Sequence, residues 1–323
     1  MSNLADLADR ALEATVVLSF TKIGPQARSR LFDWTSAEEL PRLDGKVVLV
    51  TGATSGLGEA AAASMAQLGG SVRLLARNPE KATATVERIR SLTGNDDVQA
   101  GIADLANLDD VRRFAARFLA EHERLDVVVH SAGALVHDYQ RTTDGIELTA
   151  QTHVVAPFLL TQELMPLLQT TPRSRVVLVT SGGMYSEPLS IDDLEMPADQ
   201  FKGTTAYARA KRAQVALVKE WAHSTDRVAF HAMHPGWVDT PGVEAALPRF
   251  HRILAPLLRS PDEGADTIVW LATAEGPMSH SGSLWLDRRQ RSSHRLRRTR
   301  RPDEAAERRR LIDWCERKSA QPN

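Results

Sequence analysis

The sequence predicts a doubly wound α/β fold, in which helices cover both faces of a mostly parallel sheet. Three observations support this prediction. From residue 46 onward, short apolar runs of strand length alternate with stretches of helical length. The connections between them are short, which is typical of parallel strands joined by crossover helices. With 323 residues, 42% of them hydrophobic, the chain has enough material for one such domain and its core.

Seven strands and six helices are expected within a domain that covers residues 46–287. Segments 1–45 and 288–323 lie outside the alternating pattern and are expected to be N- and C-terminal extensions. Ligands of such sheets bind just beyond the carboxyl ends of the strands. The expected strands are 46–51, 71–76, 98–102, 125–130, 174–180, 228–233 and 282–286, and the expected helices are 56–68, 79–93, 108–122, 146–169, 204–224 and 262–274.

A glycine-rich loop follows the first expected strand. Residues 51–58 read Thr-Gly-Ala-Thr-Ser-Gly-Leu-Gly, and a helical stretch of small residues comes directly after them. Glycines let the backbone approach a pyrophosphate, and a helix N-terminus offers free N–H groups and a partial positive charge. The loop predicts a dinucleotide site, and a glycine turn without a ligand is the alternative. The expected cofactor contacts here are Gly52, Thr54, Ser55, Gly56, Leu57 and Gly58.

Tyr207 and Lys211 stand four residues apart, on the same face of an expected helix. A neighbouring ammonium favours the phenolate, so the pKa of the tyrosine is expected to fall from about 10 toward neutral. Such a group can give and take protons near pH 7. The same spacing also occurs by chance in ordinary surface helices, so its meaning depends on the glycine loop upstream.

Together these residues resemble the motifs of the short-chain dehydrogenase/reductase family, whose members have a Rossmann fold. Further matches follow in the family's order along roughly residues 45–287. The segments 181–184 and 233–243 are most similar to the member-12-like branch of the family, and 143–147 resembles its retinol-dehydrogenase-type relatives. The matching residues are Thr51, Gly52, Gly56, Gly58, Asp104, Leu105, Ala132, Gly133, Ser181, Tyr207, Lys211, Pro235, Gly236 and Thr240.

The resemblance implies hydride transfer between a nicotinamide and a carbonyl or alcohol carbon. It implies that Ser181 donates a hydrogen bond to the substrate oxygen and that Tyr207 delivers the proton. Lys211 would hold the nicotinamide ribose; adjacent Thr180 is an alternative to Ser181 as the functional hydroxyl. The further cofactor contacts that it implies are Asp104, Leu105, Ser131, Ala132, Gly133, Tyr207, Lys211, Pro235, Gly236, Val238 and Thr240.

The sequence departs from the family pattern at two places. His153 stands where the family has an asparagine that helps hold a water in the proton relay to the lysine. Histidine can donate and accept, so it is a fourth candidate catalytic residue; a packing substitution is the alternative. His130-Ser131 replaces the usual Asn-Asn, while Ala132-Gly133 after it is intact.

The end of the second strand predicts the choice of cofactor. Arg77-Asn78 follows that strand, and Arg77 lies 19 residues after Gly58, where an NAD enzyme usually places an acidic residue. An arginine there can meet the 2′-phosphate of NADP(H), so NADP(H) is favoured over NAD(H). The alternative is an arginine that only caps the strand.

Two loops border the expected active site. The segment 187–203 makes the spacing between Ser181 and Tyr207 longer than is typical of the family, and it is expected to form a flap. A surface loop without substrate contact is the alternative. The segment 241–258 takes the place of the family's substrate lid. Its apolar residues indicate an apolar substrate side, or ordinary packing of the lid.

The extensions carry less specific signals. Leu4, Leu7 and Leu18 follow helical spacing; this helix is expected to pack on the body or on a second subunit. Membrane contact is the alternative, which Asp6, Asp9 and Glu13 would weaken by repelling anionic lipid. Residues 288–310 hold eleven arginines and are expected to form a solvated tail, dispensable for activity. A segment that binds nucleic acid or an acidic surface is the alternative. Residues 303–318 should form a charged helix.

Composition and charge limit the possible partners and the compartment of the protein. The formal net charge of −1 implies no polyanionic partner, so no nucleic acid is expected. Cys315 is the only cysteine, which fits a reducing compartment, and no apolar run is long enough to span a membrane. A cytoplasmic enzyme is therefore expected, with a small-molecule substrate and without a metal site. The resemblance implies a homodimer or homotetramer. The competing interpretation is a non-enzymatic NAD(P)-binding protein on the same fold.

Overall fold

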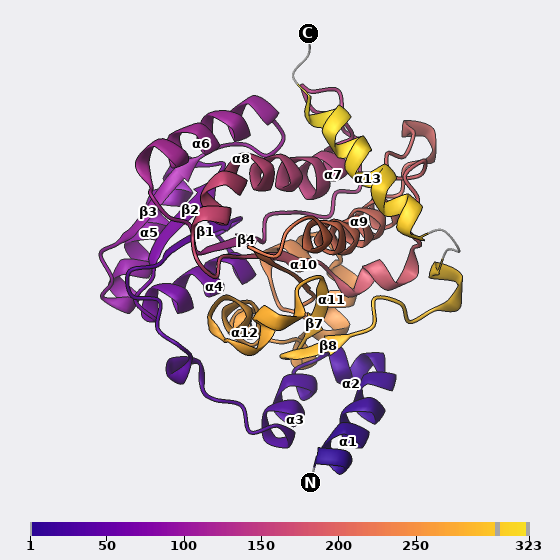
Figure 1. Ribbon diagram of the computed structural model, residues 1–323. Coiled ribbons are helices and arrows are strands. Elements are labelled where there is room, and N and C mark those ends of the chain that lie inside the picture. The colour runs from indigo at the N-terminus through magenta and orange to yellow at the C-terminus, as the bar shows by residue number, and fades with distance from the viewer. Residues whose placement is uncertain (1, 301–303, 321–323) are drawn as a thin grey trace.

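The computed structural model describes residues 2–300 and 304–320, and its centre is one eight-stranded sheet. The strand order is β3-β2-β1-β4-β5-β6-β7-β8, and helices lie on both faces of the sheet (Figure 1). The strands are β1 (Val47–Thr51), β2 (Ser71–Ala76), β3 (Val98–Ile102), β4 (Val127–His130), β5 (Arg175–Val179), β6 (Ala229–Met233), β7 (Ser283–Leu286) and β8 (Arg289–Arg291). The first seven strands are parallel, as predicted.

The six expected helices of the central domain are present to within about two residues, and two short helices within 241–254, α10 and α11, were not predicted. The helical segment 148–170 is continuous, but its backbone widens into a π-helix at Gln151–Val155. The helices are α4 (Gly56–Gln67), α5 (Pro79–Thr93), α6 (Leu108–Glu121), α7 (Leu148–Ala150), α8 (Ala156–Thr170), α9 (Gly203–Ser224), α10 (Pro241–Ala246), α11 (Pro248–Leu254) and α12 (Pro261–Thr273). The extensions add α1 (Ser2–Ala14), α2 (Val16–Phe20), α3 (Ile23–Leu31) and α13 (Glu304–Ser319).

The alternation of side chains along the strands divides the core into two layers. Val47 and Leu49 of β1 face the layer under α6, α8 and α9, whereas Val48 and Val50 face the layer under α4, α5 and α12. Because β1 pairs with both β2 and β4, the chain winds away from β1 in opposite directions. A crevice opens at the carboxyl end of the sheet at this point, where ligands of such folds bind.

The eighth strand corrects the predicted count of seven. Residues 289–291 pair antiparallel with β7, with Leu284 opposite Arg291. The turn between the two strands is Asp287-Arg288, and both residues have φ near +54°. Arg-Gln-Arg carries no apolar alternation, so nothing in the sequence marked it as a strand.

The C-terminal extension is packed against the body, so the prediction of a solvated tail was wrong. Arg288 pairs with Asp266 at 2.5 Å, and its guanidinium lies 4.7 Å from the centre of the Trp34 ring. The expected charged helix is α13, which buries Leu311, Trp314 and Cys315. In Figure 1, α13 lies against α9 and α8.

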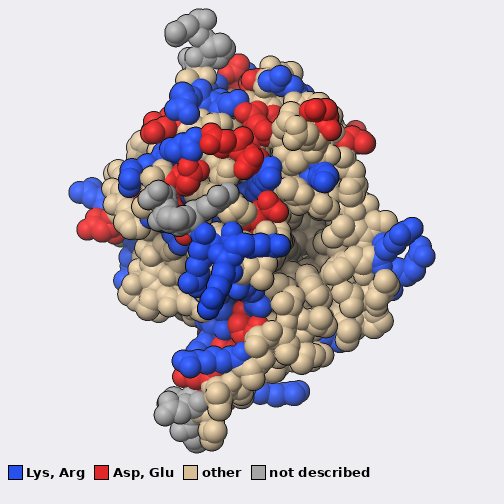
Figure 2. Space-filling view, turned by 90° about the vertical axis from the view of Figure 1, so that its right-hand side faces the viewer, with Lys and Arg blue, Asp and Glu red and all other residues tan. Residues whose placement is uncertain are grey.

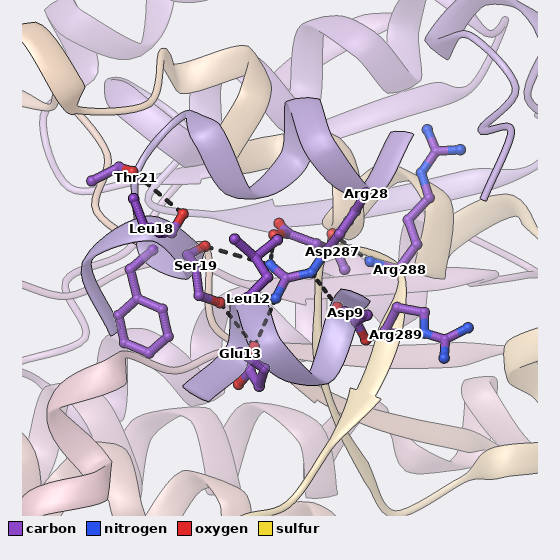
Figure 3. A network of polar contacts seen from close by, with 12 residues as sticks. Asp9, Leu12, Glu13, Leu18, Ser19, Thr21, Arg28, Asp287, Arg288 and Arg289 are labelled. Atoms are coloured by element: carbon purple, nitrogen blue, oxygen red, sulfur yellow. Dashed lines mark hydrogen bonds and ion pairs between the residues drawn. The ribbon is translucent and has the colours of Figure 1, made fainter. Parts of the chain in front are cut away.

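The N-terminal extension packs on the body as predicted, but through its charged residues and not its leucines. Leu4 and Leu7 are 75% and 62% exposed, whereas Asp9 is buried. Arg28 of α3 lies at the centre of the contact and binds carboxylates of both ends of the chain (Figure 3). We call this ion-pair network the clasp; its members are Asp9, Glu13, Arg28, Arg259, Asp287, Arg291 and Arg295.

The clasp joins the first helices to the segment around β8. Asp9 receives hydrogen bonds from Arg28 at 2.7 Å and from Arg291 at 2.8 Å. Burial alone would raise the pKa of Asp9, but the hydrogen bonds and charges of Arg291 and Arg28 lower it to about 2. Asp287 binds Arg28 and Arg259, each at 2.5 Å. Among the described residues, no helix is both long and apolar enough to cross a membrane.

Candidate active site

A groove of about 550 Å³ lies at the carboxyl end of the sheet, over the switch point between β1 and β4. Its walls come from the loops that follow β1, β2, β3 and β4 and from the segment after β6. Thirteen of the predicted cofactor contacts line it, which are Gly52, Thr54, Ser55, Gly56, Leu57, Gly58, Arg77, Asp104, Leu105, Ser131, Ala132, Gly133 and Thr240.

The glycine loop closes tightly around the start of α4. Gly52 has φ +67°, and a Cβ there would come within 2.5 Å of the Ala132 Cα. Gly56 has φ +54° and opens α4. Ser55 makes no side-chain cap, so the first N–H groups of α4 stay available at the end of the groove. This cradle fits a pyrophosphate, which binds through such N–H groups.

Arg77 and Asn78 separate in the structure. Arg77 lines the groove and is exposed, and it makes no ion pair with any residue that the structure describes. Asn78 does not line the groove; its side chain caps α5 by accepting a hydrogen bond from Lys81 N at 2.8 Å. The sequence shows two polar residues at the strand end, but only one of them is free to meet a ligand.

Ser181, Tyr207, Lys211 and His153 meet beside the groove. Ser181 ends the segment after β5, and Tyr207 reaches it from the second turn of α9. The Thr180 hydroxyl instead donates to the Lys211 carbonyl at 2.7 Å. Of the two adjacent hydroxyls, Thr180 therefore holds α9 against the sheet, and Ser181 is the one beside Tyr207.

The pKa of Tyr207 moves in the direction opposite to the prediction. Burial raises the pKa of Tyr207, and the Ser181 hydroxyl opposes this rise. The Lys211 ammonium lies 5.4 Å from the centre of the tyrosine ring and donates to the Val179 carbonyl at 2.8 Å. Burial lowers the pKa of Lys211 to about 7. The spacing of four residues identified the pair, but it carried no information on how strongly both groups are desolvated.

His153 lies in the π-helix, and its ring faces Tyr207. The two rings meet edge to face, with centres 5.2 Å apart. Nε2 donates to the Ala134 carbonyl at 3.0 Å, whereas Nδ1 is buried and without a partner among the described residues. Burial and the charge of Lys211 lower the pKa of His153 to about 3, which keeps the ring neutral.

The segment after β6 is held by the N-terminal extension. Gly236 has φ +77°, and a Cβ there would lie 2.5 Å from Arg259 and 2.6 Å from the Phe20 carbonyl. That carbonyl also accepts a hydrogen bond from Trp237 N at 2.7 Å. Pro235, Gly236 and Val238 do not line the groove, and neither do Tyr207 and Lys211. Tyr207 lies one residue away from it, since the neighbouring His153 donates to the carbonyl of the groove residue Ala134.

The two predicted loops are anchored by contacts that the sequence did not indicate. In the expected flap, Arg209 of α9 binds Glu187 at 3.2 Å and the Asp193 carbonyl at 2.8 Å. Glu195 pairs with Lys318 of α13. The flap is therefore fixed to the helix that carries Tyr207 and to the C-terminal helix. The expected lid is formed by α10 and α11, and the Ala246 carbonyl binds His137 Nε2 at 2.8 Å.

Further residues line the groove that sequence reasoning missed. Ala103, Ala134 and Val136 follow strand ends, so a stricter search past β3 and β4 would have found them. Thr149 and Thr152 come from the helical segment that crosses the groove, and no local sequence signal marks them.

The comparisons with known proteins agree with this geometry. The model of the short chain dehydrogenase family matches residues 46–249. The chain belongs to the short-chain dehydrogenase/reductase family. It is 36% identical over 298 residues to the dehydrogenase/reductase SDR family member 12 of Bos taurus. This alignment covers 92% of this chain and 93% of the relative. It is 33% identical to the retinol dehydrogenase 11 of Mus musculus, over 78% of this chain and 80% of the relative.

A solved structure shares the fold and contains a nicotinamide cofactor. It is a short chain dehydrogenase from Shigella flexneri complexed with NADP, with a TM-score of 0.64 and 26% identity. The match covers 78% of this chain and 100% of that chain. Membership of the family makes the protein an NAD(P)(H)-dependent oxidoreductase.

Proposed function

We propose that this protein is an NADP(H)-dependent dehydrogenase/reductase that interconverts a carbonyl and an alcohol, with Tyr207 as the general acid and base. The observation that carries the proposal is the meeting of Ser181, Tyr207 and Lys211 beside the groove. The bound nicotinamide would exchange the hydride with the substrate carbon. The chain's own residues then have to bind the substrate oxygen and move the proton.

In the direction of reduction, negative charge develops on the substrate oxygen. Ser181 donates a hydrogen bond to that oxygen, which acts as one arm of an oxyanion hole. The raised pKa of Tyr207 keeps its hydroxyl protonated at neutral pH, so it can deliver the proton. Lys211, in its charged form, holds the nicotinamide ribose and stabilises the phenolate that remains.

We include His153 in the proton relay. The main-chain carbonyl of His153 is occupied by Gln214 Nε2 at 2.9 Å, so it offers less to a bridging water. The free acceptor is Nδ1, which has no partner among the described residues and lies on the ring that faces Tyr207. A water that bridges Nδ1 and the Lys211 ammonium would connect the active site to the relay.

NADP(H) as the preferred cofactor rests on Arg77. The guanidinium is exposed at the groove, and the nearby acidic Glu80 lies in the first turn of α5. A planar, permanently charged fork suits a 2′-phosphate. The Shigella relative with NADP bound supports the same proposal.

Three smaller points of the proposal concern the surroundings of the enzyme. The exposed Leu4, Leu7 and Val17 offer an apolar surface for peripheral membrane contact, and arginines neutralise the acidic residues beside them. Flotation with anionic vesicles, with and without Leu4→Ser and Leu7→Ser, tests this contact.

A cytoplasmic location and a homodimer or homotetramer stay predictions, as does the absence of a nucleic-acid partner.

The competing candidate is a non-enzymatic NAD(P)-binding protein on the same fold. The decisive experiment follows NADPH absorbance with a panel of aldehydes and ketones, and NADP⁺ with alcohols. Turnover that falls roughly 10²–10⁴-fold in Tyr207→Phe supports the proposal. Cofactor binding should hardly change in this variant, because the glycine loop and Lys211 remain. Cofactor binding without turnover of any aldehyde, ketone or alcohol in the panel would favour the non-enzymatic binding protein.

A further inference from the structure

A second cavity, larger than the cofactor groove, lies between the two ends of the chain. Its volume is about 920 Å³, which is in the range of small-molecule sites. It is bordered by α1 and α2 on one side and by the segment 290–296 on the other. Its third wall is Gly182 and Gly183, the two residues directly after Ser181. We call it the interterminal cavity.

The body of the interterminal cavity is apolar. Ala14, Val16, Phe20 and Leu296 contribute to its walls. Phe20 packs against Gly182, the residue after Ser181, since a Cβ on Gly182 would lie 2.6 Å from its ring. Val16 and Leu296 are 42% and 43% exposed, and such large side chains gain free energy when a ligand covers them.

Charge in the wall is concentrated on three arginines against one carboxylate. Arg291 is bound to Asp9 and Arg295 to Glu13, so both are largely neutralised within the clasp. Arg10 is exposed on α1 and has no ion pair with any residue of the described part of the chain. It therefore adds an uncompensated positive charge at the rim. Figure 2 shows basic side chains gathered on one face of the molecule beside a hollow with largely uncharged walls.

Two donors in the same wall are buried and have no hydrogen-bond partner among the residues that the structure describes. The Tyr185 hydroxyl is one of them, on a residue that is 6% exposed. Arg291 Nε is the other; it lies 3.6 Å from Glu13 Oε2, beyond hydrogen-bond distance. Buried donors are almost always satisfied in folded proteins. Rotation of these two side chains toward the cavity would bring both donors to a ligand with acceptor oxygens.

We propose that the interterminal cavity binds an apolar chain that ends in a single carboxylate, as in a medium- or long-chain fatty acid. The carboxylate lies among Arg10, Tyr185 and Arg291, and the apolar chain lies along Val16, Phe20 and Leu296. This site is separate from the cofactor groove, and the inference goes beyond the proposed oxidoreductase function. Its test requires neither turnover nor a nicotinamide cofactor.

The test is calorimetric titration of the full chain with sodium dodecanoate, below the concentration at which it forms micelles. One dodecanoate is expected to bind per chain. Dodecan-1-ol has the same chain without the charge and should bind roughly ten- to a hundredfold more weakly, because hydrogen bonds to charged groups contribute about 1.5–3 kcal/mol. Acetate has the charge without the chain and should not bind. Absence of dodecanoate binding, or equal binding of the alcohol, would overturn the proposal.

Paired variants locate the site. Val16→Asp places a charge in the cavity wall and should weaken dodecanoate at least tenfold, whereas Val17→Asp, on a neighbouring residue outside the wall and 48% exposed, should not. Arg10→Gln should weaken binding about tenfold, with Arg30→Gln as its exposed control on α3. Unchanged thermal unfolding shows that each variant is folded. An equal effect of the two members of a pair would place the fatty acid elsewhere and refute the assignment.

Discussion

Arg28 donates to Asp287 across 259 positions of sequence, with 2.5 Å between Nη1 and Oδ2. Both side chains are buried, and the pair joins the third helix of the N-terminal extension to the turn between β7 and β8. The main-chain carbonyls of residues 19–21 accept hydrogen bonds from Arg259, which also binds Asp287. Two arginines therefore share one carboxylate at the junction of both termini and the catalytic domain.

Arg28→Met is expected to lower the free energy of unfolding by about 3 kcal/mol, because it leaves buried carboxylates without their full set of partners. Urea unfolding of parent and variant measures the difference. Arg30→Met, on the exposed side of the same helix, is the control and should change stability by less than about 0.5 kcal/mol. A loss below about 1 kcal/mol in Arg28→Met would mean that Arg259 and Arg291 hold the carboxylates without it.

Deletion of residues 288–323 is now expected to give an insoluble or inactive protein, contrary to the sequence prediction. The deletion removes β8 and the partners of Asp9 and Glu13, and it uncovers the side of α8 and α9 that α13 protects. Solubility and circular dichroism check this outcome. Replacing the exposed Arg297 and Arg298 by serine keeps the fold and serves as the control. A soluble and active truncated protein would instead support the sequence prediction that the tail is dispensable.

The buried Lys211 makes stability depend on pH. Its pKa is about 7 in the folded protein and about 10.4 when unfolded, so the unfolded state binds more protons between these values. The contribution of Lys211 to the free energy of unfolding should therefore rise by up to about 1.4 kcal/mol per pH unit from pH 7 to about 10. Urea unfolding of parent and Lys211→Met across this range isolates it. Parallel pH profiles of the two proteins would contradict the lowered pKa.

Substitution of His153 separates a relay from a packing role. If Nδ1 accepts from the bridging water, His153→Asn should keep most of the turnover, because its amide oxygen also accepts. His153→Leu fills similar space without an acceptor, and its kcat should fall while the KM for the cofactor stays the same. Steady-state rates of the three proteins decide between the roles, and equal rates would leave packing as the explanation.

Arg77→Ala should weaken NADPH roughly ten- to a hundredfold, as expected for the loss of hydrogen bonds to a charged phosphate. The affinity for NADH should change much less, because NADH has a hydroxyl in place of the phosphate. Fluorescence titration of both cofactors into both proteins measures the preference. A parent protein that prefers NADH, or a variant with unaltered preference, would show that Arg77 only caps the strand.

The central domain could be predicted closely from sequence because its signals are local. β1, the glycine loop and α4 follow one another within 21 residues, and short apolar runs of strand length indicate the parallel strands. Tyr207 and Lys211 were found in the same way, since they share one helix, whereas Ser181 and His153 were predicted from the family resemblance. Their pKa values could not be predicted, because desolvation depends on the elements that pack around them.

The extensions were predicted poorly because their partners are distant. A run of arginines is ordinarily a solvated segment, and nothing near residue 291 in the sequence points to Asp9. Helical spacing correctly indicated α1, but the leucines that define its stripe are exposed and the carboxylates face inward. Amphipathic pattern identifies a helix, but here ion pairs between the termini determine which side is covered.

The clasp also has a consequence for how the protein is made. Translation proceeds at roughly 5–20 residues per second, so Arg28 leaves the ribosome about 10–50 s before Asp287 is added. During that interval the first three helices have none of their partners from β8, and the Phe20 ring lacks Arg295, whose guanidinium lies 4.9 Å from its centre in the finished fold. Closure of the N-terminus therefore waits for nearly the last residues, so a nascent chain arrested before β8 should remain open to protease at its beginning.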